Sequence, residues 1–257
     1  MDLTVEITQH VSASSHRVLD VTAADAARLL AALPDGATER ELPGSAAHAY
    51  LDALIVKPWG HELRVYDDRW TDIWRLAIEP GKGTSLHAHP RKDTCVVCIG
   101  GAAVLTTGAG DEIPLAEGSV VHIRAGALHE TFAEGGADLL EVELPRDKFD
   151  LVRIDDRYGR AGQRYEGAAA SRREPCRLDP CPTGPPQARL RRHCATGCFR
   201  FNLESAGWAQ RSARDLVVAI PLETRSMLKR DLRVLTSDAL AAVNDVQMLL
   251  TVRSNHR

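Results

Sequence analysis

Three histidines of this chain stand at spacings that suit a metal site. His87 and His89 are separated by one residue, and His129 follows 40 residues after His89. Side chains alternate between the two faces of a β-strand, so His87 and His89 point to the same side, and Asp93 has the same parity if the strand continues that far. The spacing therefore predicts that one strand presents several ligands of one divalent transition metal: Fe, Zn, Mn, Ni or Co.

A distant segment must complete this site. His129 comes after a strand-like apolar run at 120–123 and a glycine turn, so only a fold that joins distant strands, such as a small β-barrel, places it beside His87. Three imidazoles and one carboxylate leave positions open for water or substrate, which predicts catalysis. Asp93 is one methylene shorter than Glu, so direct ligation, ligation through water, and a site of three histidines all stay open.

Charged residues beside these histidines are the candidates for handling a substrate. Arg91 and Lys92 directly follow the His-x-His pair, where they would contact an anionic substrate at the barrel mouth; a solvated turn is the alternative. His122 and Glu130 flank His129 in the sequence, and whichever faces the pocket is the predicted proton-transfer group.

The elements that must position these residues are mostly strands. From Lys57 to about Glu143, short apolar runs separated by glycine turns predict an antiparallel β domain; they cover 73–78, 96–99, 102–105, 120–123 and 139–142. Before them, residues 22–33 begin with Thr22 as an N-cap and contain good helix formers, which predicts one helix.

Composition places the chain among soluble proteins with a hydrophobic core. Its 257 residues are 44% hydrophobic, and the formal net charge of −3 provides no general attraction to nucleic acid or to anionic membranes. A small-molecule partner is therefore expected. The first residues do not resemble a secretory leader, and no apolar run is long enough to span a membrane, so we expect a cytoplasmic location.

The six cysteines divide into two groups. Cys95 and Cys98 are three residues apart on an expected strand, which sends them to opposite faces and argues against a joint role. The other four fall in or beside a Pro/Gly-rich stretch together with His193, and they are either a structural zinc site or reduced thiols: Cys176, Cys181, Cys194 and Cys198.

Both motifs of the cupin superfamily can be placed on this sequence, and the chain resembles a cupin on that basis. The first motif matches at Gly81, His87, His89, Asp93 and Gly100, with aspartate in place of the usual glutamate. The second matches at Gly118, Gly126 and His129, whereas Arg124 and Ala133 depart from it. The resemblance implies a double-stranded β-helix, that is, an all-β jelly-roll barrel.

Residues 55–160 are similar to one cupin family in particular, the type II mannose-6-phosphate isomerases. The likeness lies in the flanks of the barrel, Lys-Pro-Trp-Gly at 57–60 and Asp-Leu-Val-Arg-Ile-Asp-Asp-Arg-Tyr-Gly at 150–159. It implies a metal-dependent aldose–ketose isomerase of phosphosugars. We therefore expect isomerase or epimerase chemistry on a small, anionic, sugar-like substrate; an Fe(II) cupin dioxygenase and a noncatalytic sugar or sugar-nucleotide binder are the alternatives.

Strand-like runs resume in the last third of the chain, at 198–203, 216–220, 232–235 and 246–252. They contain no His-x-His pair, so we predict a shorter, metal-free second cupin half; a paired sheet sealing the first barrel is the alternative. The expected organisation is an N-terminal segment (1–55), a metal-binding cupin domain (56–160), a linker (161–188) and a second β domain (189–257). Edge strands of such barrels pair across two-fold axes, which favours a homodimer.

Overall fold

The computed structural model describes residues 16–33, 40–41, 46–67, 71–172, 194–196, 199–222, 234–242 and 248–254. The chain divides into two compact units. One is His16–Glu174, called the barrel unit below; the other contains Pro175–Arg257 together with Met1–Ser15 and is called the C-terminal unit. No helix in the described part is long and apolar enough to cross a membrane.

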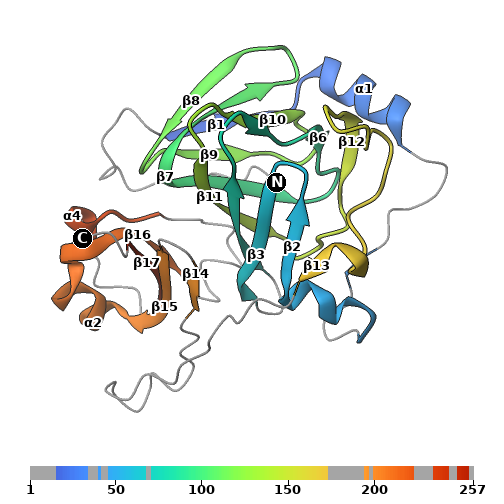
Figure 1. Ribbon diagram of the computed structural model, residues 1–257. Coiled ribbons are helices and arrows are strands. Elements are labelled where there is room, and N and C mark those ends of the chain that lie inside the picture. Colours follow the sequence, from blue (N-terminus) through green and yellow to red (C-terminus); the bar gives the residue numbers. More distant parts are fainter. Residues whose placement is uncertain are drawn as a thin grey trace. The chain divides into compact units, whose positions relative to one another are not determined.

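The barrel unit is built from strands, as the sequence predicts (Figure 1). Nine of its strands are hydrogen-bonded in the order β12-β6-β10-β7-β11-β4-β3-β2-β13, and the other four pair at its sides, making a 13-stranded sheet. Their bounds are β1 His16–Leu19, β2 Leu54–Lys57, β3 Gly60–Asp67, β4 Asp72–Ile78, β5 Lys82–Gly83, β6 Leu86–Ala88, β7 Asp93–Thr107, β8 Glu112–Ala116, β9 Val120–Ile123, β10 His129–Ala133, β11 Ala137–Leu144, β12 Val152–Asp155 and β13 Ser171–Arg172.

The long strand β7 joins the two sides of this sheet. Its first half pairs with β11 and β9, and its second half pairs with β10 and β8. At the junction, Gly101 has a φ of 72°, and a Cβ there would lie 2.4 Å from the carbonyl oxygen of Gly136. Only glycine fits that close approach, so β7 bends here and wraps the sheet around a common interior.

The helices of the barrel unit are short. The helix α1, Ala23–Ala32, begins after Thr22, whose hydroxyl accepts a hydrogen bond from the backbone N–H of Asp25 in a capping box, which confirms the predicted helix. It lies beside β12 (Figure 1), and Leu29 packs with Leu128 and Val152. Two 3-10 helices, Ala46–Asp52 and Ala168–Ala170, complete the unit.

The interior of the barrel unit is apolar over most of its length. Its core cluster includes Trp74, Leu76, Val96, Leu105 and Leu139, all at most 3% exposed. Cys98 belongs to the same cluster, and both Cys95 and Cys98 are free thiols. Burial raises the pKa of Cys95 to about 12 and that of Cys98 to about 11, so both stay protonated at neutral pH.

The C-terminal unit is a smaller antiparallel sheet with short helices. Its strands β14 (Cys194–Thr196), β15 (Phe199–Ser205), β16 (Leu216–Pro221) and β17 (Met248–Ser254) have the order β14-β15-β17-β16. The helices are α2 (Ala206–Arg211), α4 (Ser237–Leu240) and a 3-10 turn, Ala213–Asp215.

Three of the four strands expected in this unit are confirmed as β15, β16 and β17. Of the fourth, only residues 234–235 are described, and Leu235 forms an isolated bridge with Ala219. That this unit is a second cupin half stays a prediction. Cys176, Cys181, Cys198 and His193 lie outside the described residues, and Cys194 is described only as backbone of β14.

Candidate metal centre

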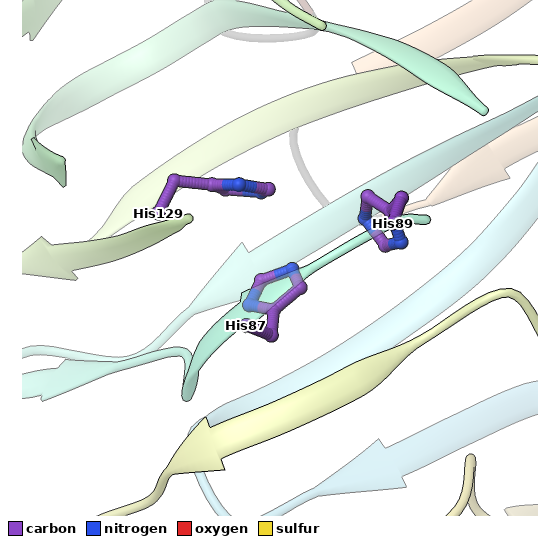
Figure 2. A group of neighbouring side chains, drawn as sticks. All are labelled: His87, His89 and His129. Carbon is purple, nitrogen blue, oxygen red and sulfur yellow. The ribbon is translucent and has the colours of Figure 1, made fainter. Parts of the chain in front are cut away.

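The strand pairing brings the three predicted histidines together. His129, the first residue of β10, is paired directly with His87 of β6, and His89 follows the end of β6. The ring centroids of His129 and His89 lie 4.3 and 5.0 Å from that of His87, and Figure 2 shows the three rings gathered together. One potential ligand atom from each ring lies within 4.8 Å of the other two, which is a spacing that a single metal ion can bridge.

Backbone carbonyls define which ring nitrogen of each histidine is free. The Nδ1 atoms of His87, His89 and His129 lie 2.7, 2.7 and 3.0 Å from the carbonyl oxygens of Ser85, Asp150 and Ala127. A carbonyl only accepts, so each Nδ1 carries the proton and each Nε2 keeps a lone pair. The Nε2 atoms of His89 and His129 are buried and have no hydrogen-bond partner. Buried nitrogens left unpaired in this way are what a metal ion would satisfy.

Electrostatics keeps the three imidazoles neutral. Burial is the largest cause for each one, and it lowers the pKa of His87 and His89 well below the usual value and that of His129 to about 4. The positive charge of Lys92 acts in the same direction. Because only a neutral imidazole binds a metal, no proton has to be removed near neutral pH.

The turn of the second motif holds the first motif in place. Gly126 has a φ of 88°, and its N–H donates to the carbonyl oxygen of His89 at 2.8 Å. The N–H of Ala127 donates to the carbonyl oxygen of Arg124, so the turn closes although arginine stands where cupins carry proline. The two histidine segments are thus linked by backbone as well as by side chains.

Asp93 lies apart from the histidine group. The parity argument required one continuous strand, but β6 ends at Ala88 and β7 begins at Asp93. Its carboxylate accepts hydrogen bonds from the N–H of Ala125 at 2.8 Å and from the guanidinium of Arg124 at 3.3 Å. The neighbouring Thr94 is fully buried, with no partner for its hydroxyl oxygen. This geometry favours the alternative of three histidine ligands.

A cavity of about 50 Å³ adjoins the centre and is lined by His87 and His89. Five cationic side chains and two carboxylates also line it: Lys57, Lys92, Lys148, Arg153, Arg160, Glu62 and Glu141. Lys92 is therefore the one predicted substrate-binding residue that reaches the cavity, because Arg91 is paired with Asp147 and Asp150 instead.

The two predicted proton-transfer residues do not line this cavity. Glu130 follows His129 directly on β10, so it points to the opposite face, where it lies 3.3 Å from Arg157. His122 is on β9, where it lies beside β1 and has its Nε2 3.8 Å from the carboxylate of Asp93.

Comparison with known proteins agrees with this geometry. Residues 74–143 match the family model described as a cupin domain. The chain therefore contains a cupin domain. Mannose-1-phosphate guanylyltransferase ManC of Salmonella typhimurium is 30% identical over 110 residues, and the Escherichia coli mannose-1-phosphate guanylyltransferase is 33% identical over 111 residues. Each match covers 41% of this chain and 23% of the relative, so the chain spans about a quarter of their length.

The solved structures that are similar to the chain include a protein described as a cupin. A sugar phosphate isomerase from a cupin superfamily, from Silicibacter pomeroyi, is 24% identical, with a TM-score of 0.33. The match covers 46% of this chain and 77% of that chain. The family match and the 13-stranded sheet together confirm the all-β jelly-roll fold that the motifs predict.

Inside the barrel unit, Lys148 is the centre of a buried ion network. Its Nζ lies 3.0 Å from carboxylate oxygens of both Glu62 and Glu143 and 3.8 Å from Glu141. Burial alone would lower the pKa of Lys148, but these carboxylates together raise it well above the usual value. Burial would likewise raise the pKa of Glu62 and Glu143, yet Lys148 and the other lysines around them lower both.

A second group of cations meets at Glu166. Lys57 and the guanidinium groups of Arg153 and Arg160 form ion pairs with this one carboxylate, at 2.9 Å from Arg153 and 2.6 Å from Arg160. Arg153 is the cross-strand partner of His87. Sequence reasoning did not single out these residues, although Lys57 and Arg153 lie inside the two flanking segments that carry the resemblance to the isomerases.

Proposed function

We propose that this chain is a metal-dependent cupin enzyme that isomerises a small, anionic, sugar-like substrate. One observation carries the proposal: three neutral imidazoles have converging ligand atoms, and two of them, His87 and His89, line a cavity to which five cations and two carboxylates also contribute. Imidazole ligands suit Fe, Zn, Mn, Ni or Co, and three of them leave coordination positions for a substrate. The homodimer and the cytoplasmic location remain predictions.

His87, His89 and His129 would hold the metal, and their protonated Nδ1 atoms would keep each ring oriented through the backbone carbonyls. When bound, the metal would act as a Lewis acid that polarises a carbonyl or hydroxyl oxygen of the substrate. The remaining groups of the cavity would orient the substrate and move protons.

The cations of the cavity are suited to the anionic end of the substrate. Arg153 stands across from His87, and a guanidinium binds phosphate or carboxylate oxygens in pairs. A volume of about 50 Å³ is enough for an ion and a few waters. The likeness to mannose-1-phosphate guanylyltransferases supports a phosphosugar as substrate.

The experiment that tests this function combines metal analysis with a reaction. Protein purified without oxygen is analysed for metal, next to a His87→Ala/His129→Ala double variant and a His61→Ala control. His61 lies on β3 beside Arg75, away from the centre. We expect one metal ion per chain in the wild type and the control, none in the double variant, and interconversion of mannose 6-phosphate and fructose 6-phosphate only where metal is bound.

Other outcomes point to other functions. Stoichiometric iron with oxygen uptake and no isomerisation would favour the cupin dioxygenase. Failure of the wild type to bind any of the five metals after reconstitution would contradict the catalytic metal and leave a sugar-binding module.

A further inference from the structure

Four carboxyl groups of the barrel unit are buried in one ion network: those of Glu62, Asp72, Glu141 and Glu143. Of these, Glu62 and Glu141 line the cavity that adjoins the histidines. A group that transfers a proton to or from a substrate must be within hydrogen-bonding reach of it. These two residues are therefore the carboxyl groups of the network that can serve a substrate.

Glu62 is already fully engaged. It forms ion pairs with Lys57 and Lys148, and it accepts a hydrogen bond from the hydroxyl of Tyr165 at 2.7 Å. The two lysines hold the pKa of Glu62 well below its usual range. A carboxylate stabilised in this way is a poor proton acceptor, so the role of Glu62 is to neutralise the charges of the two lysines.

Glu141 is held much less tightly. Lys148 is its ionic partner among the described residues, and the distance of 3.8 Å is longer than a hydrogen bond. Its side chain is 11% exposed, against 4% for Glu62, so it keeps access to the cavity. The backbone of Glu141 is paired on both sides, with Trp74 of β4 and Val96 of β7, which fixes its position in the centre of the sheet.

The surroundings of Glu141 tune it for proton transfer near neutral pH. Burial is the largest cause that raises its pKa, to about 7, and the negative charges of Glu143 and Glu62 act in the same direction. Lys148 and Lys92 oppose them. A general base is most effective when its pKa is close to the working pH.

We propose that Glu141 is the general base of this cupin site, which removes and returns the proton that moves between two substrate carbons. The proposal rests on the proposed isomerase function. It also replaces the two sequence-based candidates, His122 and Glu130, because neither of them lines the cavity.

The step balances without any oxidant or cofactor beyond the metal. The Glu141 carboxylate takes the hydrogen of carbon 2 of an open-chain aldose phosphate as a proton. The electron pair of the broken C–H bond forms the double bond between carbons 1 and 2, and the π pair of the carbonyl at carbon 1 moves to its oxygen, which gives an enediolate. Glu141 then returns this proton to carbon 1, while the proton of the hydroxyl on carbon 2 passes to the oxygen on carbon 1. The product is the ketose phosphate.

The test follows two reactions of mannose 6-phosphate in heavy water by proton NMR: conversion to fructose 6-phosphate and hydrogen exchange at carbon 2. It uses metal-loaded wild type, Glu141→Gln, Glu141→Asp and the matched control Asp138→Asn. Asp138 lies on the same strand, β11, pairs with Arg75 at 2.6 Å, and does not line the cavity. Metal content and circular dichroism of every variant confirm that it is folded and loaded.

We expect Glu141→Gln to lower the conversion rate at least 100-fold, as removal of a general base does. Glu141→Asp should keep part of the rate, Asp138→Asn should stay within about 10-fold of wild type, and the rise in rate with pH around 7 should vanish in Glu141→Gln. A loaded Glu141→Gln that converts the substrate at the wild-type rate would overturn the role of Glu141 and leave the isomerase intact. A loaded wild type that shows neither conversion nor exchange would overturn the isomerase itself, and the role of Glu141 with it.

Discussion

The barrel unit and the C-terminal unit both have an apolar core, but they differ in their buried charges. In the barrel unit, Lys57, Glu62, Lys92 and Lys148 are buried and line one cavity, and Glu143 is buried beside the two lysines Lys92 and Lys148. In the described part of the C-terminal unit, Glu204 is the one buried charged residue, and Leu216, Leu240 and Leu249 pack with small apolar residues.

This difference is informative because buried ions do not make a fold more stable than apolar packing would. Removing a charge from water costs several kcal/mol, and the attraction between partners roughly offsets that cost. Both units form a sheet over an apolar core, so the buried charges of the barrel unit are not needed to make its sheet. They are concentrated around the cavity beside the histidines, where the proposed function would use them.

The largest effect on stability is expected from Lys148→Met. This change leaves Glu62, Glu141 and Glu143 without their shared cation. Breaking such a buried network by removing one partner costs about 3–5 kcal/mol of unfolding free energy. The comparison is Arg253→Met in the C-terminal unit, which removes one ion pair with Glu204 and should cost roughly 2 kcal/mol. Chemical denaturation of both variants measures the difference, and equal losses would contradict the contrast between the two interiors.

A substitution in the core of the C-terminal unit tests whether this unit can be destabilised without any effect on the metal centre. Leu249 of β17 is fully buried in an apolar cluster, and Leu249→Ala should cost about 3 kcal/mol because it leaves a cavity. The three histidines lie in the other unit, so metal content should be unchanged. Denaturation and metal analysis of the same sample check both parts; loss of metal would show that the centre depends on the C-terminal unit.

The smallest effect is expected from the pH dependence of Glu141→Gln. Glu141 has a pKa of about 7 in the folded protein and 4.5 ordinarily, so the folded state binds its proton more tightly. Its contribution to stability is thus lost as pH rises from 4.5 to 7, and glutamine avoids that loss. The variant should melt a few degrees above wild type at pH 8 and at about the same temperature at pH 4.5. A melting difference that is the same at both pH values would contradict the raised pKa.

Local sequence signals were sufficient for several elements. Thr22 and Asp25 form the capping box of α1 because a helix start depends on neighbouring residues. The short apolar runs within β11 and β7, bounded by glycine turns, similarly indicate strands, since such runs depend only on neighbouring residues.

Local signals did not predict the position of a side chain where a strand ended or where the side chain pointed to the opposite face of the sheet. Asp93 does not lie with the three histidines because β6 ends at Ala88 and a new strand, β7, begins at Asp93. Glu130 follows His129 directly on β10, so its side chain points to the face of the sheet opposite to that of His129. Sequence spacing also could not predict that Lys57, Glu141 and Arg153 line the cavity beside the histidines. They come from β2, β11 and β12, which are far apart in the sequence and share a cavity only after the sheet closes.

The amino-acid sequence by itself determined the three histidines, the β-rich fold and the resemblance to cupins, because these depend on residue type and short spacings. Only the tertiary structure decided which charged groups lie near the histidines and which of them line the adjoining cavity. Those answers depend on pairings between distant strands, such as His129 with His87, and on the burial that shifts the pKa of Glu141. Burial and long-range pairing are properties of the closed barrel, so no local pattern encodes them.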